Sequence, residues 1–197
     1  RFIWERHRDA RHGGYAWGVN DSDIVDGSKQ AYGHAFVLLA ASSAKLVGHP
    51  LADQMIADVT EVIDTRFWDE ARGAVREEFA NDWQQISTYR GQNSNMHLTE
   101  ALMAAFEATG DKLYLTRAER IARLIIEKNA VPLGHRVAEH FNESWEVDKS
   151  YRHESEMFRP SGTTPGHWLE WSRLLYQLFV LGRKEHSWMT DAARNLF

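Results

Sequence analysis

The chain has 197 residues, of which 43% are hydrophobic, contains no cysteine, and carries a formal net charge of −5. This size and composition predict one globular unit with a core of useful size, and the missing cysteine excludes disulfides, thiolate-bound metals and thiol catalysis and is typical of a reducing cytoplasm. The 28 acidic residues outnumber the 23 basic ones along the chain, so nucleic acid is excluded as the main partner. No apolar run approaches the roughly 18 residues of a membrane span, which leaves a small or neutral ligand as the expected partner.

In chain order, residues 1–9 resemble the tail of an outer helix that begins earlier, and the chain starts with neither Met nor a signal-peptide pattern. We therefore expect the natural N-terminus to lie elsewhere. After a glycine-marked loop at residues 9–17, an apolar helical stretch runs from Tyr32 to Gly48, and an amphipathic stretch follows at residues 51–67. These two stretches predict a helical hairpin.

The hairpin pattern occurs three times. Each copy begins with a histidine near the start of an apolar stretch that ends at a glycine, in residues 32–48, 95–110 and 165–182. Each is followed by an amphipathic stretch with apolar residues at i, i+3, i+4 and i+7, in residues 51–67, 114–129 and 188–197. Since a fixed repeat decides architecture before local propensity does, the repeating unit is a helical hairpin.

Stacked hairpins whose first helices begin with polar side chains predict an all-α fold, an (α/α)6 toroid or barrel with one pocket at the starts of the inner helices. A closed ring of six pairs needs about twice this length, so the chain would cover about three helical hairpins. We expect residues 1–197 to form a single domain, the central part of such a barrel, with an open array of hairpins as the alternative. Glycine-marked loops at residues 9–17, 69–79 and 133–141 predict small β-hairpins at the helix ends.

Candidate catalytic side chains lie where the second and third repeats begin. In each, a histidine and a glutamate share one helical face at i, i+3, as His97 with Glu100 and His167 with Glu170. A carboxylate beside an imidazole can fix its tautomer and raise its basicity, which suits general acid–base catalysis near neutral pH. The alternative is that this repetition reflects common ancestry of the repeats alone.

Other polar and aromatic residues allow more than one interpretation. The isolated His34 fits a satisfied structural residue best, and Tyr32 is balanced between a pocket and a structural role. Di-iron helical bundles use the order Glu-x-x-His with further glutamates; the order is reversed here, so no metal site is predicted. Trp168 and Trp171 either stack on a sugar face or pack between helices.

Two longer motifs resemble a known family. Asn93-x-x-Met96-His97-x-x-Glu100-Ala101 and Arg159-Pro-x-Gly-x-x-Pro-Gly-His167-x-x-Glu170-Trp171 resemble the N-acylglucosamine 2-epimerase superfamily, and within it the mannose/sulfoquinovose-type aldose–ketose isomerases. The resemblance covers essentially the whole chain, including Gly13-Gly14-Tyr15-x-Trp17 and Lys29-x-x-Tyr32-Gly33-x-Ala35-Phe36. Pro165 and Trp171 favour the isomerase branch over the cellobiose 2-epimerases.

The resemblance implies an (α/α)6 barrel that moves a proton between C1 and C2 of an open-chain monosaccharide, mannose and fructose being the first pair, through a cis-enediolate without metal or other cofactor. It implies an acid–base role for His167, oriented by Glu170, and a catalytic role for His97, which with Tyr32 lines the pocket and helps ring opening. Substrate contacts are implied for Arg159, Asn93, Tyr32, Trp171 and Glu100. Family members carry a second catalytic histidine and an arginine in units outside this chain, so activity of the chain alone is not expected.

Alternatives remain at this point. One is a sugar 2-epimerase of the same superfamily, and another is a sugar-binding α-barrel without activity. A glycoside hydrolase or lyase on a similar scaffold would need two carboxylates across the pocket, for which Glu100 and Glu170 are the obvious pair. The formation of homo-oligomers is left open.

Overall fold

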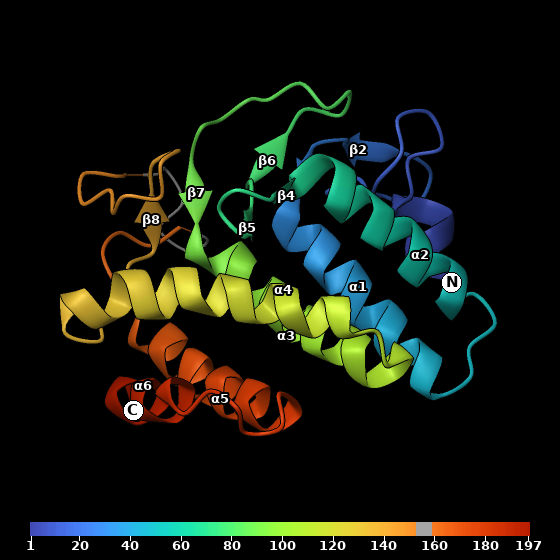
Figure 1. Ribbon diagram of the computed structural model, residues 1–197. Coiled ribbons are helices and arrows are strands. Elements are labelled where there is room, and N and C mark those ends of the chain that lie inside the picture. The colour runs from blue at the N-terminus through green and yellow to red at the C-terminus, as the bar shows by residue number, and fades with distance from the viewer. Residues whose placement is uncertain (153–158) are drawn as a thin grey trace.

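The computed structural model describes residues 1–152 and 159–197, and it consists mainly of helical hairpins (Figure 1). A π-helical turn, η1 (Ile3–His7), precedes the first hairpin. The hairpins are α1 (Ala31–Leu46) with α2 (Ala52–Val62), α3 (Gln92–Thr109) with α4 (Lys112–Ala122), and α5 (Pro165–Leu181) with α6 (Trp188–Leu196). The turns η2 (Ile63–Phe67), η3 (Arg123–Ala130) and η4 (Val131–Leu133) extend α2 and α4. These bounds confirm the three predicted hairpins.

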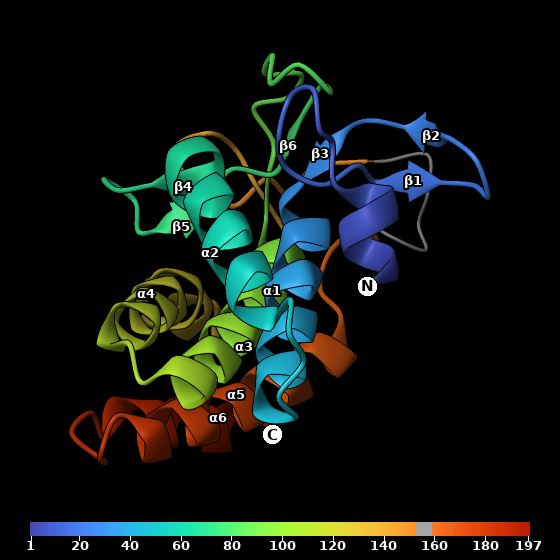
Figure 2. The same cartoon turned by 90° about the vertical axis from the view of Figure 1, so that its right-hand side faces the viewer.

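The first helices of the hairpins form an inner row and the second helices an outer row. Helix α3 packs between α1 and α5, while α2, α4 and α6 each pack on the inner helix of their own hairpin. In Figure 2, α2 and α4 lie together on one side of α1 and α3. None of the described helices has the length and apolar character that crossing a bilayer requires. The arrangement is that of inner and outer helices in an (α/α)6 barrel.

Glycines end the inner helices where the sequence predicts. Gly110 follows α3 with a φ of 77°, a left-handed conformation that glycine adopts at little cost, and its amide donates to the Phe106 carbonyl at 2.7 Å. Helix α5 also ends at a glycine, but Gly182 keeps a φ of −78°. The left-handed turn falls instead on Arg183 and Lys184, with φ of 56° and 64°.

Short strands gather at the starts of the inner helices, on the upper side of Figure 1. Two pairs are local hairpins, β1 (Gly18–Val19) with β2 (Ile24–Asp26) and β4 (Trp68–Asp69) with β5 (Ala74–Val75). The second of these lies in the predicted loop at 69–79, whereas residues 9–17 contribute a single bridge, Arg8 with Tyr15. The hairpin predicted at residues 133–141 is wrong, because its strand pairs elsewhere.

Two further pairs join segments that are distant in the sequence. Strand β3 (Lys29–Gln30), which leads into α1, pairs with β6 (Glu78–Phe79), and β7 (Arg90–Gly91), which leads into α3, pairs with β8 (His140–Phe141). Helices α1 and α3 are therefore each tied to the loop that follows the outer helix of their own hairpin. In the same way, the amides of Ala31 and Gln92 donate to the carbonyls of Glu77 and Glu139, at 2.9 Å and 3.1 Å.

This register corrects the alignment of the repeats by their histidines. Counted from the equivalent strands, His34 of α1 corresponds to Asn95 of α3 rather than to His97. The two side chains make the same bonds: His34 Nδ1 lies 2.7 Å from the Gln30 carbonyl and Asn95 Nδ2 lies 2.9 Å from the Gly91 carbonyl, each four residues earlier. Both are buried, so the position of His34 is structural.

Candidate active site

A cavity of about 630 Å³ opens where the inner helices α1, α3 and α5 begin. Its wall brings together five of the residues that the sequence singled out: Tyr32, Asn93, His97, Arg159 and His167. Ser94 of α3 and side chains from the strands and loops complete the wall, the latter being Trp17, Gln30, Glu77, Glu78, Tyr89, Pro160 and Thr164.

His167, in the first turn of α5, is held by a carboxylate from another part of the chain. Its Nδ1 lies 2.9 Å from Glu139 Oε1 and 3.0 Å from Oε2. Gln92 Nε2 also approaches Nδ1, at 2.9 Å, but the Trp171 indole donates to Gln92 Oε1 at 2.8 Å and so turns the amide nitrogen of Gln92 toward Glu139. Glu139 therefore accepts from both, and the network assigns the proton of neutral His167 to Nδ1.

The consequence is a basic nitrogen in the cavity. With Nδ1 donating to Glu139, Nε2 of His167 carries the free lone pair. Burial disfavours the imidazolium, but the hydrogen bond and charge of Glu139, with a further contribution from the charge of Glu170, outweigh burial and raise the pKa of His167. The expectation that Glu170 orients His167 is wrong, because the carboxylate that contacts the ring is Glu139.

His97 has the opposite electrostatic environment. It lies on α3, with its ring centroid 5.1 Å from that of Tyr32, and burial lowers its pKa despite the nearby charges of Glu170 and Glu100. Nδ1 of His97 is 3.8 Å from Glu100 Oε2, beyond hydrogen-bond length. One cavity thus holds two imidazoles whose pKa values are moved apart, the pattern that separates acid and base roles.

Arg159 presents a fixed cation to the cavity. Its Nη2 donates to Glu78 Oε2 at 2.7 Å, its Nη1 donates to the Tyr151 hydroxyl at 3.1 Å, and its guanidinium carbon lies 4.6 Å from the centroid of the Tyr89 ring. Burial disfavours the charge, but these bonds and the charge of Glu77 outweigh burial, so the pKa of Arg159 is raised. A guanidinium has five N–H donors, so further donors remain for a ligand oxygen.

Asn93 and Tyr32 also line the cavity. Among the described residues, Asn93 Oδ1 is a buried side-chain oxygen without a hydrogen-bond partner, so it can accept a bond from a ligand hydroxyl without losing an existing one. Burial, followed by the charge of Glu170, raises the pKa of Tyr32, so its hydroxyl stays protonated and can donate. Both side chains are suited to a polyhydroxylated ligand.

Trp171 and Glu100 do not contribute to the cavity wall. Trp171 has 0% of its surface exposed, so it cannot stack on a sugar; it packs in the core and fixes Gln92 instead. Glu100 accepts from Arg173 of α5 at 2.6 Å, and it is absent from the cavity lining, as is Glu170. Of this pair, Glu100 is therefore engaged by Arg173 rather than presented to the cavity. The exposed aromatic at the cavity is Trp17, which is 43% exposed.

Sequence reasoning missed Glu139, Glu77 and Tyr89. All three lie in or beside the short strand pairs that join distant segments, and no local periodicity marks such pairs. Trp17 was quoted only as part of the Gly-Gly-Tyr-x-Trp motif. In the described ranges 1–152 and 159–197, no three His, Cys, Asp or Glu side chains are grouped so that they could hold a metal ion.

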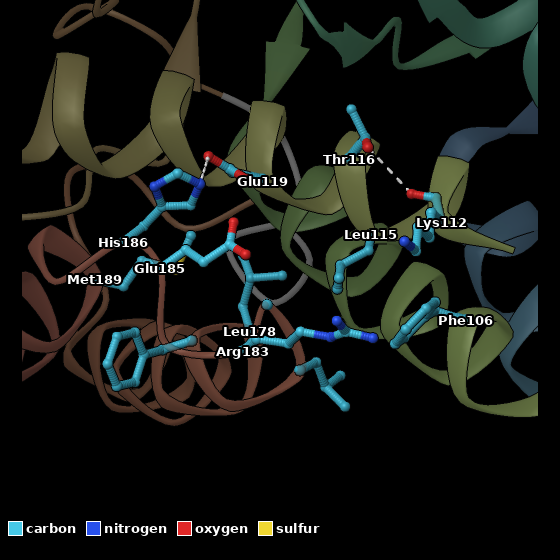
Figure 3. A pocket seen from close by; sticks show the side chains of 13 residues that line it. Phe106, Lys112, Leu115, Thr116, Glu119, Leu178, Arg183, Glu185, His186 and Met189 are labelled. Carbon is cyan, nitrogen blue, oxygen red and sulfur yellow. Dashed lines mark hydrogen bonds and ion pairs between the residues drawn. The ribbon is translucent and has the colours of Figure 1, made fainter. Parts of the chain in front are cut away.

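A second, smaller hollow of about 240 Å³ lies between the α3–α4 and α5–α6 hairpins (Figure 3). It is lined by α4, by the end of α5 and by the turn between α5 and α6, with Phe106 from α3 and Met189 from α6. His186 of the turn pairs there with Glu119 at 3.0 Å. It contains none of the motif residues. The 630 Å³ cavity is therefore the candidate active site.

Among the described residues, the cavity combines two imidazoles with oppositely shifted pKa values, an arginine fixed by hydrogen bonds, and an amide oxygen without a hydrogen-bond partner. These groups define a site for a small polar ligand, and helical hairpins form the scaffold that carries it. The chain belongs to the N-acylglucosamine 2-epimerase (GlcNAc 2-epimerase) family, whose sequence profile matches residues 1–197. This confirms the resemblance inferred from the motifs.

The chain is also similar to two individual proteins of known name. The chain is 45% identical over 196 residues to a D-mannose isomerase of Pseudomonas cannabina pv. alisalensis and 42% identical over 193 residues to one of Thermobifida fusca. Each match covers 96% of this chain and 47% of the relative, so the chain spans about half the length of these relatives.

Solved structures agree on the fold. A crystal structure of D-mannose isomerase superimposes with a TM-score of 0.92 at 37% identity, covering 100% of this chain and 50% of that one. A cellobiose 2-epimerase from Bacillus thermoamylovorans B4167 matches with a TM-score of 0.86, 21% identity, and 100% and 51% coverage. At that identity, the epimerase shows a shared fold alone.

Proposed function

We propose that the protein containing this chain is an aldose–ketose isomerase that interconverts a monosaccharide such as mannose with its 2-ketose. The observation that carries the proposal is the geometry of His167, whose Nδ1 is held by Glu139 at 2.9 Å while its Nε2 is free to act as a base in the cavity. Relatives named D-mannose isomerase support the choice of substrate.

In the proposed step, Nε2 of His167 removes the proton from C2 of the open-chain aldose. The electron pair of the C–H bond forms the C1–C2 double bond of a cis-enediolate, and the carbonyl electrons move to O1. Arg159, held by Glu78 and Tyr89, supplies donors to the enediolate oxygens, where negative charge develops. The O2 hydroxyl proton then passes to O1, the electrons left on O2 form the C2 carbonyl, and the C1–C2 double bond takes the carbon-bound proton back from His167 at C1, which gives the ketose. The raised pKa of His167 suits an imidazole that takes and returns a proton near neutral pH.

We also propose that the reaction needs no metal ion, because side chains in the cavity can stabilise the developing charge. Arg159 and the donors of Tyr32 can match the charge that a divalent ion would otherwise stabilise. A sugar 2-epimerase is the second candidate, because the family profile bears that name and the same base would begin both reactions. An epimerase returns the proton to the other face of C2, so the identity of the product separates the two.

The same proposal covers the domain to which the site belongs, its cellular location and its cofactor requirement. We assign the chain to one domain, the central part of a barrel whose other hairpins cover α1 and α5, where apolar side chains such as Leu46, Val47, Leu169 and Val180 are 67%, 83%, 50% and 60% exposed. A cytoplasmic location and the absence of a cofactor are proposed on composition and on the family resemblance.

The test uses the full-length protein with mannose in D₂O, before and after exhaustive chelation. We expect formation of fructose that resists chelation, with solvent deuterium at the transferred position. His186→Ala, which alters a histidine in the smaller hollow, serves as a matched control and should retain activity. Loss of activity that Mn²⁺ or Co²⁺ restores, with no deuterium incorporated, would overturn the mechanism; glucose as the product would replace the isomerase with the epimerase.

A further inference from the structure

The strand register reveals a second carboxylate in the position that holds His167. Glu139 accepts from the backbone amide of Thr164, which directly precedes α5, at 3.1 Å, and from the third residue of that helix, His167. Glu77 accepts from the amide of Gly91, which directly precedes α3, at 3.2 Å, and from Ser94, the third residue of α3. The pair Glu77–Ser94 is therefore the internal-repeat counterpart of Glu139–His167.

Both members of this pair form part of the cavity wall and are otherwise buried. Glu77 is 6% exposed and Ser94 is 1% exposed. Gly91 makes the close approach possible, because a Cβ at that position would lie 2.9 Å from Glu77 Oε2 and 2.9 Å from the Tyr89 hydroxyl. The proposed enediolate step has no use for this carboxyl group.

Charged and titratable groups face Glu77 from each neighbouring element: Glu78 on β6, Tyr89 and Arg90 around β7, and Arg159 from the loop before α5. Burial raises the pKa of Glu77 to about 7, against the lowering effects of Ser94, Arg159 and the Gly91 amide. The carboxyl group therefore carries its proton below neutral pH and loses it as the pH rises through about 7.

We propose that Glu77 and Ser94 form a proton relay that donates to the ring oxygen of the closed sugar, so that the cavity opens the pyranose before His167 acts. This inference rests on the proposed function, because an open-chain step requires ring opening. His97 lies one helical turn beyond Ser94 on the same face of α3. The two oxygens that exchange protons during ring opening are both bonded to C1, so an acid and a base side by side match them.

Ring opening transfers one proton from the sugar to His97 and one from Ser94 to the ring oxygen. His97, whose lowered pKa keeps it neutral, takes the proton of the anomeric hydroxyl, and the electrons of that O–H bond form the C1 carbonyl. The bond from C1 to the ring oxygen breaks, its electron pair stays on the ring oxygen, and this oxygen takes the Ser94 hydroxyl proton. Ser94 takes the proton of Glu77, which becomes a carboxylate held by the Gly91 amide. Ring closure in the product reverses the transfer.

The test measures ring opening separately from isomerisation. In the full-length protein, exchange NMR of the α and β anomers of mannose reports ring opening, and deuterium incorporation at C2 reports enolisation. We expect Glu77→Gln and Ser94→Ala each to slow enzyme-catalysed anomer exchange at least tenfold. The wild-type exchange rate should fall above pH 7, where Glu77 loses its proton, and this limb should be absent in Glu77→Gln. Thermal unfolding tests whether each variant is folded. If Glu77→Gln is unstable, Ser94→Ala still tests the relay, because it keeps the bond between the Gly91 amide and Glu77.

Glu139→Gln is the matched control, because it makes the same chemical change at the repeat-equivalent carboxylate. It should lower C2 deuteration while leaving anomer exchange within about twofold of wild type, since it does not contact the relay. Wild-type anomer exchange in folded Glu77→Gln and Ser94→Ala, or an equal loss of exchange in Glu139→Gln, would overturn the relay. If wild type catalyses anomer exchange through Glu77 but neither deuterates C2 nor forms ketose, the proposed function fails while the relay stands.

Discussion

His34 and His167 both lie in the first turn of an inner helix, yet their environments differ in every respect that matters for chemistry. Both ring nitrogens of His34 are used, since Nδ1 contacts the Gln30 carbonyl and Nε2 accepts from the Tyr15 amide at 3.0 Å. Burial lowers the pKa of His34 to about 4. His167 has one nitrogen on a carboxylate and the other in a cavity, and its pKa is raised.

The contrast teaches that the helix start does not decide the role of a histidine. What decides it is the group that a preceding segment of the chain brings to the ring: a backbone amide for His34 and the Glu139 carboxylate for His167. An amide donor fixes a neutral ring, whereas a carboxylate acceptor favours the imidazolium.

The largest effect is expected for His167→Ala in the full-length protein. Removal of a proton-transfer group should lower kcat by about 10³-fold, within the usual range for general acid–base catalysis, because His167 is the proposed base and its Nδ1 is the imidazole nitrogen that Glu139 holds. Thermal unfolding should remain cooperative at a somewhat lower temperature, since the substitution removes one hydrogen-bond partner of the buried Glu139 while Gln92 and the Thr164 amide remain. Steady-state kinetics with mannose tests this, and activity near that of wild type would remove His167 from the mechanism.

For His34→Ala we expect the reverse, a loss of stability without a specific loss of chemistry. The substitution deletes two buried hydrogen bonds and leaves a void against Phe67, whose ring centroid is 4.7 Å away. The free energy of unfolding should fall by about 3 to 4 kcal/mol, measured by urea unfolding. Activity per folded molecule should be retained; a specific loss of kcat in a stable variant would place His34 in the site after all.

The sequence predicts the features that local signals encode and misses those that depend on contacts between distant segments. Apolar spacing and terminal glycines specified the three hairpins, because both signals are local. The motifs placed His97, His167 and Arg159 in one cavity, since each sits at or near the start of an inner helix. Glu139 could not be found, because it reaches His167 through the two-residue pair β7–β8, which joins residues about fifty positions apart and leaves no periodic trace. Trp171 was misplaced because only its packing against Gln92 shows which side it faces.

Lowering the pH should change the stability contributions of His34 and His167 in opposite directions. The pKa of His34 is lowered from 6.5 to about 4, so its contribution to stability is complete above about pH 6.5 and is lost as the pH falls toward 4, by about 3 kcal/mol. The pKa of His167 is raised, so its contribution is present below about pH 6.5 and is lost as the pH rises through its folded value. Urea unfolding of wild type and His34→Ala should therefore converge between pH 6.5 and 4. A constant difference across that range would show that His34 does not titrate as its burial requires.

A smaller effect is expected for Glu139→Gln, which converts the partner of His167 into a neutral group. The pKa of His167 should fall, because the hydrogen bond and the charge that raise it are removed while burial remains. We expect kcat to decrease about ten- to a hundredfold, less than the roughly 10⁴-fold loss seen where a histidine is forced into the wrong tautomer, since Gln can still accept from Nδ1. An NMR titration of the imidazole checks the pKa, and an unchanged value would assign its orientation to another group.

The smallest effect tests whether His34 and Asn95 are interchangeable. Asn95 meets the same two needs as His34, since its Nδ2 donates to the carbonyl four residues earlier and its Oδ1 accepts from the Val75 amide at 2.9 Å. His34→Asn should therefore keep the bond to the Gln30 carbonyl and lose the longer reach to the Tyr15 amide, which leaves the protein about 1 kcal/mol more stable than His34→Ala. Asn95→Ala serves as the control and should cost about as much as His34→Ala. If His34→Asn is no more stable than His34→Ala, the two positions share a register but not a function, because the Tyr15 amide rather than the helix carbonyl would then be the contact that stabilises the first hairpin.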